Sequence, residues 1–227
     1  FRSVIIALVL RFTVETRPPA ERTRGGIGPL LASYRTVVSD RIFLGALLVA
    51  SFGFAGLFSY VSTSSVLLQE VYGLSAQGFG AVFATCSVGI FVGIQTGARL
   101  ALRVGSHWMI ACGNALMILA AAGVLAVGIL DGPLLALVPC MFAYTLGFGF
   151  CAPNNNVLAL QRHRTASGVA ASLMGSSSML AGSLVGPIIG SFEMTDATPM
   201  GAAMLICAAL ACAALWLVLR PHRFAAR

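Results

Sequence analysis

Six long apolar stretches, none of which contains an Asp, Glu, Lys or Arg, constrain the fold of this chain more than any other feature. They cover residues 42–66, 77–98, 108–130, 133–157, 166–191 and 198–219. A helix of about 20 apolar residues crosses the hydrocarbon core of a bilayer, and a helix satisfies its own backbone hydrogen bonds there. Only 9% of the residues are charged, whereas about 25% are charged in soluble domains. The sequence therefore predicts an all-α membrane protein with six transmembrane helices and the lipid bilayer as its first partner.

The segments outside these stretches divide the chain further. Residues 1–14 contain an apolar stretch too short to cross a bilayer, and we expect them to be the remnant of a preceding transmembrane helix. Residues 15–41 form a polar linker, which we expect to be cytoplasmic. Within it, residues 29–40 place apolar side chains opposite Arg35, as in a helix that lies on the membrane surface. Residues 42–219 are the six-helix bundle, and residues 220–227 are a basic tail.

The charged residues alternate from loop to loop. The 14 basic residues lie before the first span, in the loops after the second and fourth spans, and in the tail. The other loops contain acidic residues and no arginine: Glu70, Asp131, Glu193 and Asp196. Because cytoplasmic loops are enriched in Arg and Lys, both ends of this multi-pass protein are predicted to be cytoplasmic. This topology accounts for the basic charge without a nucleic-acid partner, which would need a soluble basic face.

Two matched glycine ridges lie in the second and fifth spans. The first consists of Gly89, Gly93 and Gly97, and the second of Gly182, Gly186 and Gly190. Glycines four residues apart share one helical face, where two backbones can approach closely. Glycine is also common in membrane helices, so a chance match is the alternative. The equivalent placement favours two inverted three-helix repeats, as in secondary transporters. We expect both ridges to be a helix-packing interface that slides against a surface outside these six helices.

Several local motifs resemble one family. They are Glu15-Thr-Arg-Pro-Pro19, Phe58–Ser65 followed by Gln69–Ser75, Leu100-Ala-Leu-Arg-Val-Gly105, and Ala166–Gly175. Together they resemble the C-terminal half of a major facilitator superfamily multidrug exporter of the Bcr/CflA (bicyclomycin/chloramphenicol resistance) type. One departure is Leu102, which stands where the superfamily's first-half motif has Asp. The resemblance implies an inner-membrane location, a proton gradient as the energy source with no cofactor, and an N-terminal six-helix half as a partner.

The resemblance also implies which spans line a central cavity, namely the first and fourth spans of this chain. Aromatic and amide side chains recur there at helical spacing, with Tyr60 less well aligned than the others. The predicted substrate-binding residues are Phe54, Phe58, Tyr60, Tyr144, Phe148 and Asn155. Aromatic faces with few polar groups suit small apolar drug-like ligands. For each of these residues, helix packing or lipid contact is the alternative.

Two further polar features have open alternatives. Arg99 and Arg103 flank the turn predicted after the second span, either as membrane anchors or as a gating latch. Such a latch would bind helix C-terminal carbonyls or an acid of the other half when the inner gate closes. Pro153 precedes three asparagines, whose amides we expect to bind backbone carbonyls near a kink or cap. Contact of Asn155 with substrate is the weaker alternative for that residue.

Other functional classes fit the sequence less well. An intramembrane hydrolase needs a catalytic His or paired acids at depth, whereas His107, His163 and His222 lie at predicted cytoplasmic ends. No enzyme is therefore expected. The six cysteines form no C-x-x-C pair and lie near no His at metal-ligand spacing, so no metal site is expected either. A scaffold or channel that self-associates through the glycine ridges is the stronger alternative. Because the spans contain no ionisable acid, a proton-coupling acid is expected in the missing half, and this chain alone is predicted not to transport.

Overall fold

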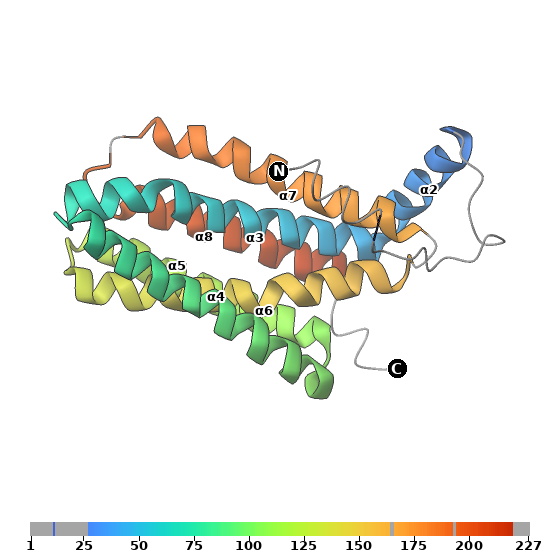
Figure 1. The fold of residues 1–227 in the computed structure, drawn as a ribbon, viewed down its shortest axis with the longest axis horizontal. Coiled ribbons are helices and arrows are strands. Elements are labelled where there is room, and N and C mark those ends of the chain that lie inside the picture. Colours follow the sequence, from blue (N-terminus) through green and yellow to red (C-terminus); the bar gives the residue numbers. More distant parts are fainter. Residues whose placement is uncertain (1–10, 12–26, 164–165, 193, 220–227) are drawn as a thin grey trace.

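The chain folds into a bundle of long helices that run along one axis (Figure 1). The computed structural model describes residues 11, 27–163, 166–192 and 194–219. The helices are α2 (Ile27–Ser39), α3 (Arg41–Val66), α4 (Ala76–Val104), α5 (Ser106–Ile129), α6 (Leu134–Gln161), α7 (Ser167–Gly190) and α8 (Thr198–Ala214). Short π-helical segments, Leu67–Val71 and Leu215–Leu219, extend α3 and α8. Six of the helices, α3 to α8, are long and apolar enough to cross a membrane, which confirms the predicted all-α fold.

Two helices extend further than the apolar pattern predicts. Helix α4 continues to Val104 instead of residue 98 and ends where Gly105 adopts a φ of 95°. Helix α6 continues to Gln161 through Pro153. Arginine does not end a helix, because its long side chain can reach water from the last turns, whereas glycine at positive φ does end one. Arg99 and Arg103 therefore lie within the last turns of α4 and do not flank a turn.

The helix contacts reveal two equivalent units. Helix α4 packs on α6, and α7 packs on α3. Helix α5 packs on α6, and α8 packs on α3. The α5–α8 and α3–α6 contacts complete the main set. Exchanging α3 with α6, α4 with α7 and α5 with α8 leaves this set unchanged, as expected for the two inverted three-helix repeats of a transporter. The middle helix of each repeat thus packs on the first helix of the other repeat.

The first glycine ridge packs inside the chain. A Cβ atom added to Gly93 would clash with the Leu146 carbonyl oxygen and would lie 3.0 Å from Gly149 Cα, and one added to Gly97 would lie 3.1 Å from Phe150 Cα. A Cβ at Gly89 would lie 2.7 Å from the Thr145 hydroxyl oxygen. All of these neighbours belong to α6. The expectation that this ridge faces a surface outside the six helices is therefore wrong: Gly149 leaves α6 bare opposite Gly93, and the two backbones meet there.

The second ridge also faces a helix of this chain, but it accommodates aromatic rings. A Cβ at Gly182 would lie 3.0 Å from Phe54 Cε1, and one at Gly186 would lie 3.7 Å from Phe58 Cε1. Gly190 has no neighbouring atom within 4 Å of that position. The predicted partner outside the six helices is therefore wrong for Gly182 and Gly186 as well, because α7 packs there on the phenylalanines of α3.

Helices α4 and α7 lie at the edges of the bundle. In each, only 17% of the most apolar 18-residue window is buried, compared with 50% in α3. Figure 1 shows α7 along one side of the central α3–α8 pair and α4 along the other. The faces of α4 and α7 that point away from this pair are therefore left uncovered by the described helices.

Candidate functional site

A pocket of about 300 Å³ lies between α3, α6 and α7, and we call it the α3–α6–α7 pocket. Its volume is at the lower end of the range for small-molecule sites. The lining residues on α6 recur every three or four positions, so that they share one helical face. The residues that form the walls are Val49, Ala50, Gly53, Phe54, Phe148, Cys151, Ala152, Asn155, Asn156, Ala171, Met174, Gly175, Ser178 and Met179.

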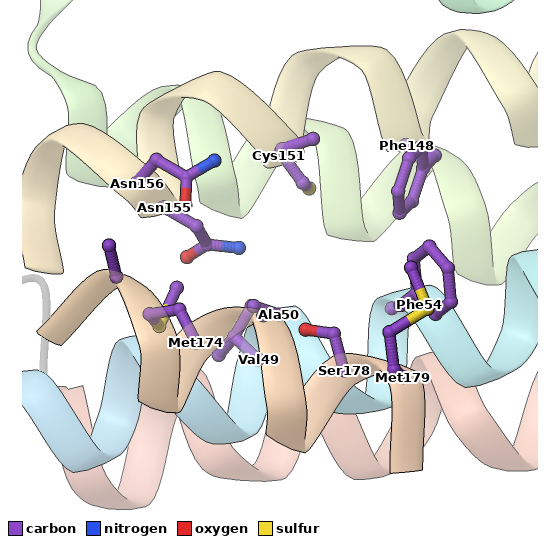
Figure 2. A pocket seen from close by; sticks show the side chains of 14 residues that line it. Val49, Ala50, Phe54, Phe148, Cys151, Asn155, Asn156, Met174, Ser178 and Met179 are labelled. Atoms are coloured by element: carbon purple, nitrogen blue, oxygen red, sulfur yellow. The ribbon is translucent and has the colours of Figure 1, made fainter. Parts of the chain in front are cut away.

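The lining of the pocket is apolar at one end and polar at the other. The rings of Phe54 and Phe148 approach each other from α3 and α6, and the amide of Asn155 projects into the space between α6 and α7 (Figure 2). None of the described lining residues is charged. Asn155 is only 2% exposed, and its Oδ1 atom has no hydrogen-bond partner among the described residues. The pocket therefore suits an uncharged, mainly apolar molecule that donates a hydrogen bond at the asparagine end.

The local sequence explains how Asn155 reaches the pocket. Pro153 has no N–H, so the carbonyl of Gly149 loses its usual partner in α6. The side chain of Asn154 donates from Nδ2 to the Phe150 carbonyl oxygen at 2.8 Å, which is the carbonyl next to the one that Pro153 frees. Asn154 is thus occupied within its own helix, and the next residue, Asn155, presents its amide to the pocket.

Three of the predicted substrate-binding residues line this pocket: Phe54, Phe148 and Asn155. Phe58 is not among the lining residues. It stacks on Phe54 with ring centroids 6.2 Å apart and lies beneath Gly182 and Gly186. Phe58 therefore supports one wall of the pocket from behind.

Tyr60 and Tyr144 do not line this pocket, so the structure does not bring them together with Phe54, Phe148 and Asn155. Tyr60 is six positions after Phe54, so it points to another face of α3. It stacks on Phe83 of α4 with ring centroids 5.9 Å apart. Tyr144 is fully buried and fills the space that Gly56 leaves on α3. Helical spacing predicts which way Tyr144 points along α6, but it does not predict that Gly56 on α3 leaves space for the Tyr144 ring.

The predicted latch residues Arg99 and Arg103 are exposed. Neither makes a hydrogen bond or ion pair with the described part of the chain, so the latch stays a prediction. Arg41 makes the type of contact expected of a latch. It donates from Nε to the Val218 carbonyl at 3.1 Å and from Nη2 to the Leu217 carbonyl at 2.8 Å. A cation at the end of a helix is favoured by the helix dipole.

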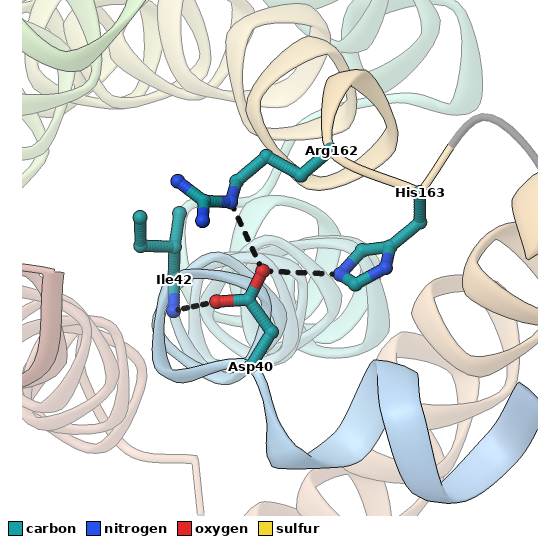
Figure 3. Close-up of polar contacts among 4 residues, drawn as sticks. All are labelled: Asp40, Ile42, Arg162 and His163. Atoms are coloured by element: carbon teal, nitrogen blue, oxygen red, sulfur yellow. Dashed lines mark hydrogen bonds and ion pairs between the residues drawn. The ribbon is translucent and has the colours of Figure 1, made fainter.

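A polar cluster that the sequence analysis missed joins the start of α3 to the end of α6 (Figure 3). Asp40 Oδ1 accepts a hydrogen bond from the backbone N–H of Ile42 at 2.9 Å and caps α3. Its other oxygen, Oδ2, lies 3.2 Å from Arg162 Nε and 3.1 Å from His163 Nε2. The His163 ring is 8% exposed and meets Phe43 edge-on at 5.7 Å. The predicted topology already placed all of these residues at one membrane face, which is the signal that would have identified the cluster.

At the opposite end of the bundle, a neutral hydrogen bond joins the same two helices. The Tyr72 hydroxyl donates to the Gly132 carbonyl oxygen at 3.1 Å. The turn that presents Gly132 contains Asp131 at a φ of 46°, a conformation that Asp tolerates better than most residues. Burial, and then the charges of Asp131 and Asp196, raise the pKa of Tyr72, so the phenol remains a donor at neutral pH.

Comparison with known proteins points to one family. The family model described as Major Facilitator Superfamily matches residues 3–184. An "Uncharacterized MFS-type transporter YdgK" of Bacillus subtilis is 30% identical over 207 residues, which are 91% of this chain and 50% of the relative. A "Bicyclomycin resistance protein homolog" of Haemophilus influenzae is 26% identical over 201 residues, 86% of this chain and 49% of the relative. These matches confirm the resemblance found in the sequence, and the chain spans about half the length of the curated relatives it matches.

Proposed function

Because the chain belongs to the major facilitator superfamily, we propose that it forms the C-terminal half of a secondary active exporter of small apolar molecules. The name of the Haemophilus influenzae relative, a bicyclomycin resistance protein homolog, supports a drug as the molecule exported. The observation that carries the proposal is the α3–α6–α7 pocket, because it combines aromatic walls with a buried amide whose Oδ1 atom has no partner in the described residues.

The partner in this proposal is an N-terminal six-helix half. The edge helices α4 and α7 support it, because they are the least buried of the six. Gln95 lies on the exposed side of α4, and its amide makes no hydrogen bond with the described residues. An unpaired amide in contact with lipid costs several kcal/mol, whereas a facing protein helix can bind it. The exposed faces of α4 and α7, and not their glycine ridges, are thus the surfaces proposed to meet the other half.

In the proposed mechanism, the two halves tilt against each other and expose the bound molecule alternately to each side of an inner membrane, with both ends of the chain in the cytoplasm. Phe54 and Phe148 hold the apolar part of the substrate, and Asn155 orients its polar part. Proton coupling rests on the family resemblance. Since the charged side chains of the described spans lie near the helix ends, the coupling acid is proposed to lie in the other half. On this proposal the chain performs transport and no enzymatic reaction.

The variant Asn155→Leu tests the role of the pocket by two measurements that should move in opposite directions. Removal of a buried amide oxygen that lacks a partner should stabilise the ligand-free protein by about 1 kcal/mol. Loss of the hydrogen bond to substrate should weaken binding of chloramphenicol, a neutral aromatic probe with O–H and N–H donors, by about 2- to 10-fold.

The matched control is Leu119→Ala on α5, a residue that is 70% exposed and does not line the pocket. This variant should leave binding of the probe unchanged. Unchanged binding in Asn155→Leu, measured by scintillation proximity on the whole transporter, would remove Asn155 from the site. A loss of stability in the same variant would mark the amide as a packing residue.

A further inference from the structure

Helices α3 and α6, which form two walls of the pocket, are joined at both of their ends. We call the contacts of Asp40 with Arg162 and His163 the inner clamp. The inner clamp lies at the end of the bundle from which α2 extends (Figure 1, Figure 3). We call the hydrogen bond from Tyr72 to Gly132 the outer clamp. Between the two clamps, α3 and α6 are separated in part by the pocket.

The two clamps occupy equivalent places in the inverted repeat. Tyr72 directly follows the π-helical end of α3, and Gly132 lies just before α6. Arg162 and His163 directly follow α6, and Asp40 lies just before α3. Exchanging α3 with α6 therefore converts one clamp into the other. In each clamp, residues after the first helix of one repeat bind a residue before the first helix of the other.

The chemistry of the two clamps is different. The inner clamp is ionic, and the carboxylate of Asp40 also caps α3 through its second oxygen. Because the Arg162 side chain is 56% exposed, solvent weakens that ion pair, whereas the His163 contact is largely buried. The outer clamp is a neutral hydrogen bond between a phenol and a backbone carbonyl. A substitution can therefore remove one clamp while the other remains intact.

We propose that Asp40 and Tyr72 are positioning residues that hold α3 and α6 at a fixed separation and thereby set the width of the pocket. The inner clamp lies about two helical turns beyond Asn155 along α6, so it places the Asn155 amide relative to the α3 wall. The edge-on contact of Phe43 with His163 also joins the two helices at their inner ends, and α8 is attached separately through Arg41. The consequence for ligand binding rests on the proposed function, but the clamps themselves do not.

Amide hydrogen exchange of the chain in nanodiscs tests the clamps without labels. Asp40→Asn keeps a side-chain oxygen that can cap α3 but removes the charge. Exchange at the start of α3 and the end of α6 should become about tenfold faster, the factor expected for loss of a charge-assisted contact, and the outer ends should not change. Tyr72→Phe removes only the hydroxyl group and should accelerate exchange only at the outer ends.

The matched control is Asp196→Asn. Asp196 accepts a hydrogen bond from the Thr198 N–H at 2.6 Å at the start of α8 but takes no part in the inner clamp. It should leave exchange at the inner ends unchanged. If either clamp variant accelerates exchange equally at both ends, or at neither, the clamps are not local positioning devices and the proposal is wrong.

Binding of chloramphenicol to the whole transporter provides the second measurement. Asp40→Asn should weaken binding about threefold or more, and the double variant Asp40→Arg/Arg162→Asp, which restores an ion pair, should recover part of the affinity. End-specific exchange without any change in affinity would overturn the claim that the clamps set the width of the pocket, whereas the pocket itself is tested separately by Asn155→Leu. Unchanged exchange would contradict the clamps and leave the pocket standing.

Discussion

Gly93→Ala should destabilise the bundle, because the α4–α6 contact has no room for a methyl group. The added Cβ would clash with the Leu146 carbonyl and would lie 3.0 Å and 3.2 Å from two backbone atoms of Gly149. Backbone atoms cannot rotate away as a flexible side chain can, so α4 and α6 must separate. Such overpacking costs about 1–3 kcal/mol, and the better helix propensity of Ala recovers at most about 1 kcal/mol. With the full propensity gain, the net loss should be up to about 2 kcal/mol.

The matched control is Gly80→Ala in the same helix, where the added Cβ meets no atom within 4 Å. It should be neutral or slightly stabilising, because only the propensity gain applies. Reversible unfolding in mixed detergent micelles, followed by tryptophan fluorescence, measures both variants. Gly149→Ala should cost as much as Gly93→Ala, and the double variant should cost less than the sum, because the helices have to separate only once. Equal stability of Gly93→Ala and Gly80→Ala would refute the close contact.

Two further predictions concern the ends of the bundle. Arg41→Gln should lower the unfolding temperature by about 2–4 °C, as expected for about 1 kcal/mol in a domain of this size. The reason is that the carbonyls at the end of the last helix lose the two hydrogen bonds that Arg41 donates. An unchanged melting curve would show that these bonds contribute nothing to stability. Since the folded-state pKa of Tyr72 is raised, its contribution to stability should be complete below about pH 10 and lost only as pH rises through the raised pKa. The difference in phenolate absorbance between the wild type and Tyr72→Phe checks this, and ionisation of Tyr72 below pH 10 would contradict it.

The sequence predicts the number and the approximate positions of the spans because the bilayer restricts what a membrane helix can contain. It misplaces the end of α4 because Arg99 and Arg103 look like a boundary, whereas the helix ends at Gly105, the first residue with a suitable backbone conformation. The periodicity of the first glycine ridge correctly marks a face for close packing. Periodicity does not identify the partner of a face, and for Gly93 that partner is α6.

The sequence predicts some of the residues that line the pocket, but not the contacts between distant parts of the chain. The family resemblance assigns the first helices of the two repeats to a cavity, and helical spacing there predicts Phe54, Phe148 and Asn155, which line the pocket. The same spacing predicts Tyr144 as a binding residue, but its ring is buried in the core, where Gly56 on α3 leaves space for it. The inner clamp depends on residues far apart in the chain, such as Asp40 and His163. Their contact depends on the tertiary fold. The sequence indicates only that both residues lie on the same side of the membrane.

The division of the transporter into two halves is the central claim, and reconstitution tests it most directly. Proteoliposomes should be prepared with this chain alone, with an N-terminal six-helix half alone, and with both halves expressed together. Transport of chloramphenicol driven by an imposed proton gradient should appear only when both halves are present, and Asn155→Leu should reduce it. Gradient-driven transport by this chain alone would contradict the account, because these six helices would then contain the whole machinery.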